Sequence, residues 1–219
     1  MIYDFKYFEA GIENGISGYQ NYRWIPEISF PMAHNLALGN KLTKYSKILD
    51  FGCAKGFLLK AFHLLGYKNV YGVDISPYAI EFADPLIKSN IALIKPGTNI
   101  SDVFNINFDL VIFKDVLEHI PANNIPSLMK SAAICSKELF IAVPLGVDNS
   151  SDQFVIPAMH NDITHITIKN KLYWESVIED NGWSIEYSGN KYSGIKTNWC
   201  EKFPEGNLFV NARSKLNYL

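Results

Sequence analysis

From residue 47 onward, hydrophobic positions fall into short apolar runs that alternate with amphipathic stretches. Within the amphipathic stretches, apolar residues recur at helical spacing, which predicts helices at 56–66, 77–88 and 122–135. The apolar runs predict buried strands at 47–51, 70–74, 91–94, 108–113 and 138–143. Because the strands are apolar throughout and alternate with helices, we expect an α/β fold with a mostly parallel sheet covered on both faces.

The C-terminal part of the chain continues this pattern after a long interruption. Residues 145–166 are irregular, and loops of this length in a compact domain are usually functional. A further helix is expected at 169–182, and two strands at 183–191 and 207–213 bring the sheet to seven strands. We therefore expect substrate contacts in the irregular segment, beside the carboxyl ends of the strands.

The first 46 residues differ from the rest because they are rich in tyrosine, phenylalanine and tryptophan and contain no clear strand. A helical stretch is expected around 31–44. We accordingly divide the chain into an aromatic-rich cap, residues 1–46, and an α/β domain, residues 47–219. Two interpretations of the aromatic residues stay open: a lid that excludes water from a site, or ordinary packing against the edge of the sheet.

The first predicted strand runs into the sequence Asp-Phe-Gly-Cys-Ala-Lys-Gly at 50–56, which an amphipathic helix follows. The second predicted strand ends at Asp74. A strand, a glycine turn, a helix and a strand that ends on an acid form half of a Rossmann-like, doubly wound nucleoside-binding fold. In such a unit Gly52 and Gly56 allow the backbone to approach a ligand, and Asp74 lies where ribose hydroxyls are bound.

The glycine turn also carries information about the charge of the ligand. A dinucleotide fingerprint needs a central glycine, and Ala54 occupies that position. Asp50 lies two residues before the first glycine, where its carboxylate would repel a diphosphate and attract an ammonium or sulfonium group. The turn therefore favours a cationic nucleoside such as S-adenosylmethionine over NAD.

Three segments in the same order resemble the class I S-adenosylmethionine-dependent methyltransferases: DFGCAKG at 50–56, VDIS at 73–76 and FDLVIFKDVLEHIP at 108–121. The resemblance is to the branch with a DVLEH segment after the fourth strand. It covers residues 47–144, with weaker similarity at 164–183. It implies a Rossmann-like sheet with an antiparallel C-terminal strand and S-adenosylmethionine as the cofactor.

The resemblance also implies roles for individual residues. Asp74 would bind the ribose hydroxyls, Ile75 would pack against the adenine, and Asp115 would lie beside the sulfonium or the acceptor. The cofactor site as a whole would comprise Asp50, Phe51, Gly52, Cys53, Gly56, Asp74, Ile75 and Asp115. The family often places an acid after the third strand to reach the adenine amino group, but this sequence has LIKPGTN there. Thr98, Asn99 or a backbone group would have to replace that acid.

The candidate catalytic residues are Asp115, His119 and His165. An imidazole can accept a proton from a hydroxyl or amine near neutral pH, and Glu118 could orient His119. The alternatives are a partly buried histidine that packs under a loop at 119 and a turn histidine bonded to backbone at 165. Methyl transfer can also proceed through in-line alignment without a strong base. We expect Lys114 to be solvated; pairing with Asp115 or contact with an anionic substrate are its alternatives.

The composition of the chain argues against a nucleic-acid partner and for a reducing compartment. The net charge is −2, and basic runs of the length that nucleic-acid binding needs do not occur. Three widely separated cysteines, Cys53, Cys135 and Cys200, predict reduced thiols in a cytoplasmic protein rather than a metal site or a disulfide framework. Charges near the N-terminus oppose a signal peptide, and the apolar stretches are too short to span a membrane.

The function that the sequence predicts is transfer of a methyl group from S-adenosylmethionine to oxygen or nitrogen of a small molecule, such as a sugar or another metabolite. Two alternatives remain: a non-catalytic protein that binds the donor and, with less support, a nicotinamide-dependent oxidoreductase. A methyltransferase acting on DNA bases is opposed by KDVL after the fourth strand, where such enzymes carry an Asn/Asp-Pro-Pro-Tyr-type segment. The sequence gives no indication of oligomeric state.

Overall fold

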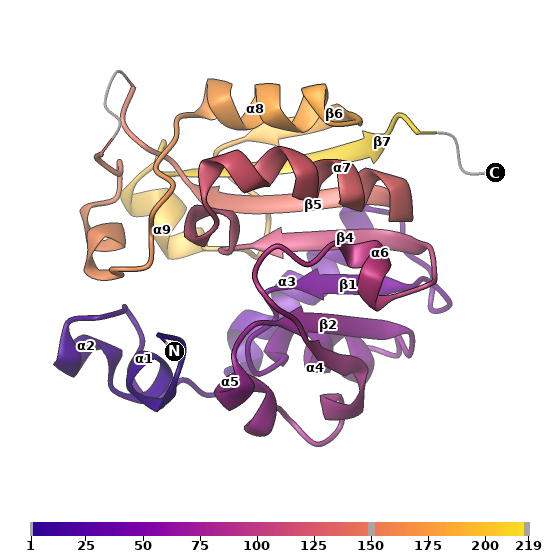
Figure 1. Cartoon of the computed structure of the whole chain (residues 1–219), viewed down its shortest axis with the longest axis horizontal. Helices are drawn as coiled ribbons and strands as arrows, with labels where there is room; N and C mark the ends of the chain where they lie inside the picture. Colours follow the sequence, from indigo (N-terminus) through magenta and orange to yellow (C-terminus); the bar gives the residue numbers. More distant parts are fainter. Residues whose placement is uncertain (1, 149–151, 217–219) are drawn as a thin grey trace.

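The computed structural model describes residues 2–148 and 152–216, and these residues form a seven-stranded sheet (Figure 1). The strand order is β3-β2-β1-β4-β5-β7-β6, in which β7 runs antiparallel to both of its neighbours. The strands are β1 (Ile48–Phe51), β2 (Val70–Asp74), β3 (Ile91–Leu93), β4 (Phe108–Lys114), β5 (Ser136–Pro144), β6 (Trp183–Gly189) and β7 (Asn207–Ser214). The predicted fold class, a mostly parallel Rossmann-like sheet with an antiparallel C-terminal strand, is confirmed.

The register of the central strands brings the acidic residues of the sequence to one edge of the sheet. Strand β1 pairs in parallel with β2 on one side and with β4 on the other, so that Asp50 lies opposite Gly72 and Ile112. The carboxyl ends of these strands therefore lie side by side. Asp74 ends β2 and Asp115 follows β4 at this edge.

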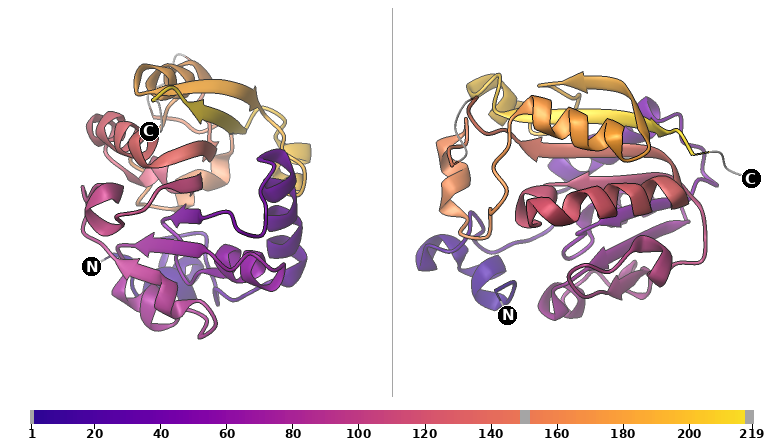
Figure 2. Two further views of the ribbon diagram at one scale, coloured as in Figure 1. Left: turned by 90° about the vertical axis from the view of Figure 1, so that its right-hand side faces the viewer. Right: turned by 45° about the horizontal axis from the view of Figure 1, so that its top comes forward.

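Helices cover both faces of the sheet (Figure 2). Helices α7 and α8 lie on one face and α3 and α4 on the other. The helices are α1 (Phe5–Glu9), α2 (Gly11–Asn14), α3 (Pro26–Gly39), α4 (Phe57–Leu64), α5 (Pro77–Glu81), α6 (Ile100–Val103), α7 (Ile125–Cys135), α8 (Lys171–Asp180) and α9 (Thr197–Lys202). Short 3₁₀ turns occur at 88–90, 117–119, 122–124 and 157–161.

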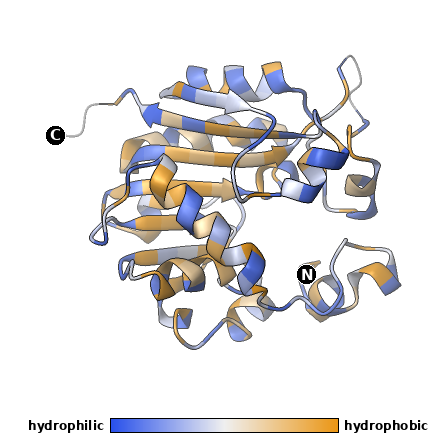
Figure 3. Cartoon of the chain, turned by 180° about the vertical axis from the view of Figure 1, so that it is seen from behind, coloured by the Kyte–Doolittle hydropathy of each residue, from blue (hydrophilic) through white to orange (hydrophobic). Residues whose placement is uncertain are grey.

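The two faces of the sheet bury separate hydrophobic clusters. Under α7 and α8, the side chains of Trp174 and Trp183 are fully buried. Their indole N–H groups donate to the carbonyl oxygens of Lys169 and Met129, so burial leaves no polar atom of these rings unpaired. Under α3 and α4, Phe62 is among the largest buried side chains. Figure 3 shows the hydrophobic colouring concentrated in the central strands, with mixed colouring in the edge strand β6.

Helix boundaries follow proline and glycine closely. Ser76 caps α5 by accepting from the N–H of Ala79, as the Ser-Pro sequence predicts. The predicted extension of α5 to residue 88 is wrong: the helix ends at Glu81, ahead of Pro85, and proline disfavours helical backbone in the residue before it. Helix α3 begins at Pro26 rather than near residue 31, because proline suits the first turn of a helix.

The N-terminal segment lies beyond the carboxyl ends of the parallel strands (Figure 1). Helices α1 and α2 belong to this segment, whereas α3 packs against α4 on the face of the sheet. In the described ranges, none of the helices has the length and apolar character that a membrane span requires.

Candidate active site

A cavity of about 460 Å³ lies where the strands β1, β2 and β4 end. This volume falls within the range of small-molecule binding sites in proteins. Its walls come from the glycine turn, the end of β2, the segment 94–99 after β3 and the turn after β4. The aromatic side chains of Tyr3, Tyr7, Phe8 and Tyr19 form the wall on the cap side.

The glycine turn owes its shape to backbone conformations that ordinary residues rarely adopt. Gly52 has φ +77° and Gly56 has φ +74°. The N–H groups of Gly52 and Cys53 both donate to the carbonyl oxygen of Val73, at 2.8 and 3.0 Å. A Cβ atom at Gly52 would lie 2.6 Å from Cγ2 of Val116. The turn therefore requires glycine at 52 for both its backbone conformation and the space beside it.

Asp74 ties the glycine turn to the start of α5. Its Oδ2 accepts from the N–H of Ala54 at 2.7 Å, and its Oδ1 accepts from the N–H of Ser76 at 2.8 Å. Burial raises the pKa of the Asp74 carboxyl, and these backbone donors oppose that rise. Because each carboxylate oxygen can accept more than one hydrogen bond, Asp74 keeps acceptor capacity toward the cavity that it lines.

The other residues predicted around the donor divide into two groups. Phe51 and Ile75 line the cavity. Asp50, Cys53 and Gly56 lie outside its lining and support it from behind. Burial raises the pKa of Asp50 to about 7, with Asp74 adding to the rise and Lys114 opposing it. Asp50 therefore changes charge near neutral pH.

The segment after β3 forms one end of the cavity, through residues 94–99. Oγ1 of Thr98 accepts from the N–H of Lys95 at 3.2 Å, so this hydroxyl stabilises the turn. Asn99 precedes α6, but its side chain makes no capping hydrogen bond. Of the two side chains that could contact the adenine amino group, the exposed amide of Asn99 therefore has more hydrogen-bonding capacity left than the hydroxyl of Thr98.

Asp115 lies between two lysine side chains. Lys114 donates to its Oδ2 at 2.6 Å, and Lys196 pairs with its Oδ1. Burial would raise the pKa of the Asp115 carboxyl, but the two ammonium groups hold it well below its usual range. The expected solvation of Lys114 is wrong: pairing with Asp115, one of the alternatives, is what the structure shows. Asp115 itself adopts a left-handed backbone conformation, with φ +54°.

Lys196 was not foreseen as a site residue. It precedes α9, in the connection between β6 and β7, where the sequence suggests only a polar loop. A single lysine in such a loop gives no local signal of function. Only the antiparallel return of β7 beside β5 brings this connection to the carboxyl end of β4.

The two candidate histidines lie together, although they are far apart in the sequence. The ring centroids of His119 and His165 are 4.6 Å apart. Nδ1 of His119 lies 2.8 Å from Oγ1 of Thr164, so Thr164 rather than Glu118 orients this ring. Burial and the neighbouring His165 lower the pKa of His119 to about 4, which keeps its imidazole neutral at pH 7. His119 lines the cavity, whereas His165 lies outside its lining and bonds to a backbone carbonyl.

The cap is attached to both sides of the cavity. Lys55 of the glycine turn forms an ion pair of 2.5 Å with Glu9 and also donates to the carbonyl oxygen of Tyr22. On the other side, the hydroxyl of Tyr7 donates to Oδ2 of Asp162 at 2.7 Å. The irregular segment thus contacts the cap, and together they cover the strand ends.

Residues 20–188 match the protein family described as "Methyltransferase domain". The chain belongs to this family. The predicted class, a class I methyltransferase, is thereby confirmed, and S-adenosylmethionine is the cofactor that this family uses. A search of curated proteins finds no match to the sequence.

Solved structures share the fold at low sequence identity. An S-adenosylmethionine-dependent methyltransferase from Clostridium acetobutylicum has a TM-score of 0.61 at 14% identity, over 83% of this chain and 90% of that chain. Magnesium protoporphyrin IX methyltransferase from Synechocystis, with the donor bound, has a TM-score of 0.55 at 18% identity, over 83% and 75%. A [4+2]-cyclase reaches 0.63 at 10% identity, over 85% and 81%. The fold therefore does not by itself specify the reaction.

Proposed function

We propose that this protein transfers the methyl group of S-adenosylmethionine to an oxygen or nitrogen atom of a small molecule. The observation that carries the proposal is the cavity at the ends of β1, β2 and β4, whose floor is the glycine turn and whose wall includes Asp74 and Asp115. Ligands of doubly wound sheets bind at this edge. A cavity of about 460 Å³ has the size of small-molecule sites, which favours a metabolite-sized acceptor over a macromolecule.

The donor occupies the side of the cavity nearest β1 and β2. Asp74 accepts the ribose hydroxyls, Ile75 and the segment 94–99 enclose the adenine, and Asn99 contacts its amino group. The glycine turn borders the methionine portion. Asp50 acts from below the floor, where its carboxylate attracts the α-ammonium group of the donor through the thin backbone of the turn.

The acceptor lies on the side of Asp115 and His119. A neutral imidazole at His119 can accept a proton from the acceptor. The paired lysines hold Asp115 in its charged form beside the expected position of the sulfonium. The part of the cap that precedes α3 excludes water through the aromatic wall of Tyr3, Tyr7 and Tyr19. Alignment of acceptor and methyl group in this enclosed space supplies much of the acceleration.

We place the protein in the cytoplasm. The support is the state of its three cysteines, which are buried and unpaired in the structure. Reduced cysteines are typical of proteins in reducing compartments.

A non-catalytic protein that binds the donor is the second candidate. This candidate is favoured by the two ion pairs of Asp115, because a carboxylate held by Lys114 and Lys196 is a weak proton acceptor. Proton removal from an acceptor would then depend on His119, which lines the cavity. Conversion of labelled donor to S-adenosylhomocysteine in the presence of a panel of hydroxyl and amine acceptors distinguishes the two candidates. Donor binding without conversion across the panel would support the second one.

The donor site is tested by calorimetric titration with S-adenosylhomocysteine. We expect Asp74→Ala to weaken binding at least about tenfold, because a charged hydrogen-bond acceptor contributes on the order of 1.5–3 kcal/mol. Asp102→Ala, which changes an exposed acid of α6, is the matched control and should bind as the parent does. Equal affinity of Asp74→Ala and the parent would disprove the proposed ribose contact.

The same titration has a pH dependence that reports on Asp50. Because burial raises the pKa of Asp50 to about 7, the carboxylate that attracts the α-ammonium is present above this pH and is lost below it. Affinity should therefore rise between pH 6 and pH 8, by up to about tenfold, as the binding-competent ionised fraction grows. Asp50→Asn should remove this dependence, and an unchanged profile in that variant would exclude Asp50 from donor binding.

A further inference from the structure

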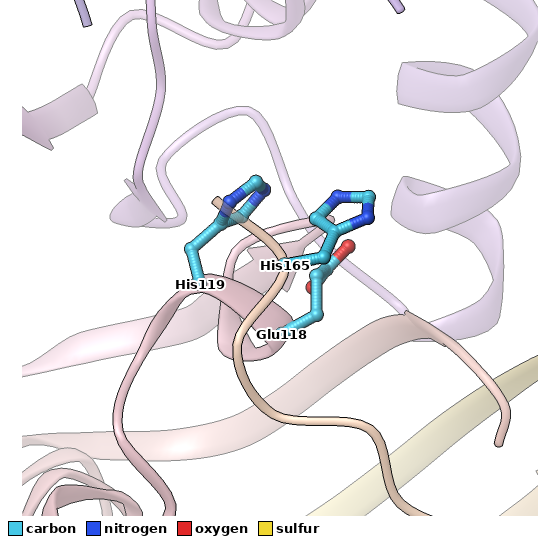
Figure 4. Close-up of side chains that lie close together, drawn as sticks. All are labelled: Glu118, His119 and His165. Atoms are coloured by element: carbon cyan, nitrogen blue, oxygen red, sulfur yellow. The ribbon is translucent and has the colours of Figure 1, made fainter. Parts of the chain in front are cut away.

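Three side chains converge beside the cavity: His119, which the proposed function uses as a base, and Glu118 and His165, to which that proposal gives no role. Glu118 and His119 belong to the 3₁₀ turn after β4, and His165 belongs to the irregular segment. One potential ligand atom of each side chain lies within 4.8 Å of the other two. Figure 4 shows the two imidazole rings next to one another, with the carboxyl group of Glu118 close to His165.

The hydrogen bonds of the two histidines fix which ring nitrogen carries the proton. Nδ1 of His165 lies 2.6 Å from the carbonyl oxygen of Met159, which can only accept, so this Nδ1 carries hydrogen. The hydroxyl of Thr164 donates to Oδ1 of Asp162 at 2.5 Å. Oγ1 of Thr164 therefore accepts from Nδ1 of His119. An imidazole whose Nδ1 carries the hydrogen has its lone pair on Nε2, so Nε2 is the potential ligand atom of both rings.

Glu118 contributes a buried oxygen atom that lacks a partner. Its side chain is 1% exposed, and its Oε2 accepts no hydrogen bond from any residue in the described ranges. An unpaired polar atom of this kind costs free energy when water is excluded. A cation between Glu118 and the two histidines would supply the missing partner.

We propose that Glu118, His119 and His165 bind a divalent transition-metal ion of the zinc class. Two imidazoles and one carboxylate are ligands that suit Zn²⁺, Co²⁺ or Fe²⁺ and are poor for Mg²⁺ or Ca²⁺, which prefer oxygen. Met159 and the Thr164–Asp162 pair occupy the supporting positions, since metal-bound histidines donate their other N–H to a carbonyl or an oxygen network.

The spacing of the ligand atoms is compatible with small side-chain movements. Bonds of ~2.0–2.1 Å place two ligands of a tetrahedral ion ~3.3 Å apart. The cluster, at 4.8 Å or less, would close by rotation about side-chain bonds. Three protein ligands leave one coordination position open to water or to an acceptor oxygen. The expectation of no metal site rested on local cysteine and histidine spacing, which does not detect ligands that the fold brings together.

The proposal is tested on the full-length, tag-free protein after removal of metals with a chelator. Addition of Co²⁺ should produce the visible absorption bands of a protein-bound ion with one ion per chain, and Zn²⁺ but not Mg²⁺ should displace it. Glu118→Gln and His165→Ala should each weaken Co²⁺ binding at least about tenfold, since even supporting residues contribute that much to metal affinity. These measurements do not depend on methyl transfer, so their failure would leave the proposed function standing.

Two histidine variants serve as controls. His160→Ala lies in the same irregular segment as His165 but outside the cluster, and His34→Ala lies on the exposed side of α3. Both should bind Co²⁺ as the parent does. Absence of binding by the parent protein, or equal binding by Glu118→Gln and His165→Ala, would overturn the proposal.

A measurement on the parent protein alone keeps the proposal falsifiable if the cluster variants do not fold. Crystals soaked with Zn²⁺ should show an anomalous-scattering peak within bonding distance of all three side chains. A peak at other residues, or none at this cluster, would refute the assignment. Folding of the variants is followed by circular dichroism, and Zn²⁺ should raise the unfolding temperature of the parent protein only.

Discussion

The donor side and the acceptor side of the cavity are built in different ways. The donor side consists of segments that are close in the sequence: the glycine turn, the end of β2 and the start of α5. The acceptor side brings together residues from distant parts of the chain, among them Tyr7, Asp115, Asp162 and Lys196. The first is held by left-handed glycines and by hydrogen bonds from backbone N–H groups, two of which the Asp74 carboxylate accepts, and the second by ion pairs and side-chain hydrogen bonds.

This difference has a consequence for substitutions. A turn held by its backbone tolerates changes of side chain except where the space or the φ angle requires glycine. A network of charges is sensitive at every member, because removal of one partner leaves another charge unpaired in a partly buried position. The donor side should therefore depend on a few glycines and on Asp74, and the acceptor side on its pairs of charges.

The largest loss in the free energy of unfolding is expected on the acceptor side, for Asp115→Asn. Asparagine tolerates the left-handed backbone at this position, so the substitution isolates the loss of charge. Lys114 and Lys196 would lose the carboxylate that they share, at a cost of about 4 kcal/mol in the free energy of unfolding. Urea denaturation measures this change.

Asp109→Asn is the matched control for Asp115→Asn. Asp109 pairs with Lys137, whose side chain is 58% exposed, and asparagine can still accept from the N–H of Lys47. Loss of an exposed pair should cost less than about 1 kcal/mol. Similar costs for the two variants would contradict the view that charge pairing holds the acceptor side together.

The second largest loss in the free energy of unfolding is expected on the donor side, and it is measured by comparing two glycines with positive φ. Gly15 has φ +64° and open space where a Cβ would lie, whereas a Cβ at Gly52 would overlap Val116. We expect Gly15→Ala to cost about 1 kcal/mol for the backbone conformation alone. Gly52→Ala should cost about 3 kcal/mol, because overpacking adds to the same backbone strain.

Donor affinity sharpens this comparison. Gly52→Ala should also weaken S-adenosylhomocysteine binding, since the turn borders the donor, whereas Gly15→Ala should leave it unchanged. Equal unfolding free energies for the two variants would show that the contact with Val116 relaxes without cost.

The smallest change in stability is expected for the ion pair of Glu9 with Lys55, which joins the N-terminal segment to the glycine turn. The side chains of Lys55 and Glu9 are 9% and 16% exposed, and Glu9→Gln removes the charge while keeping the size. Local opening of residues 1–24 should become easier by about 1.4 kcal/mol, which corresponds to tenfold faster cleavage by a protease that attacks the open form.

Glu13→Gln is the control for this experiment, because Glu13 lies in the same segment but is exposed and accepts a hydrogen bond from the uncharged side chain of Gln20. Its cleavage rate should equal that of the parent. Added donor should protect residues 1–24 in the parent if the cap is a lid. Cleavage that neither Glu9→Gln nor the donor alters would exclude this role.

The strands were the most predictable part of the fold. Each predicted strand agrees with the structure within two residues at either end. For the central strands β1, β4 and β5 the reason is that buried strands leave continuous apolar runs in the sequence. Short helices were less predictable. Helix α9 and helix α6 are too short to show a helical repeat, and α9 lies in a segment that reads as a polar loop.

Some residues of the candidate site could also be predicted from the sequence, and others could not. The turn at 50–56 and Asp74 are recognisable because they occur at fixed spacing on adjacent strands, and the structure places them at one edge. The partners of Asp115 and His119 could not be recognised. Lys196 and Thr164 carry no signal of their own, and their positions depend on how β7 and the irregular segment return to the sheet.

The sequence by itself determined the sheet, the glycine turn and the methyltransferase class, because these depend on the order of neighbouring residues and on local backbone geometry. The tertiary structure decided that Asp115 is paired rather than free and that Thr164 orients His119. It also decided that Glu118 lies close to His165, although the two residues are far apart in the sequence. The physical reason is that charge pairing, burial and ligand convergence arise between residues that only the packed sheet brings within a few ångströms of each other.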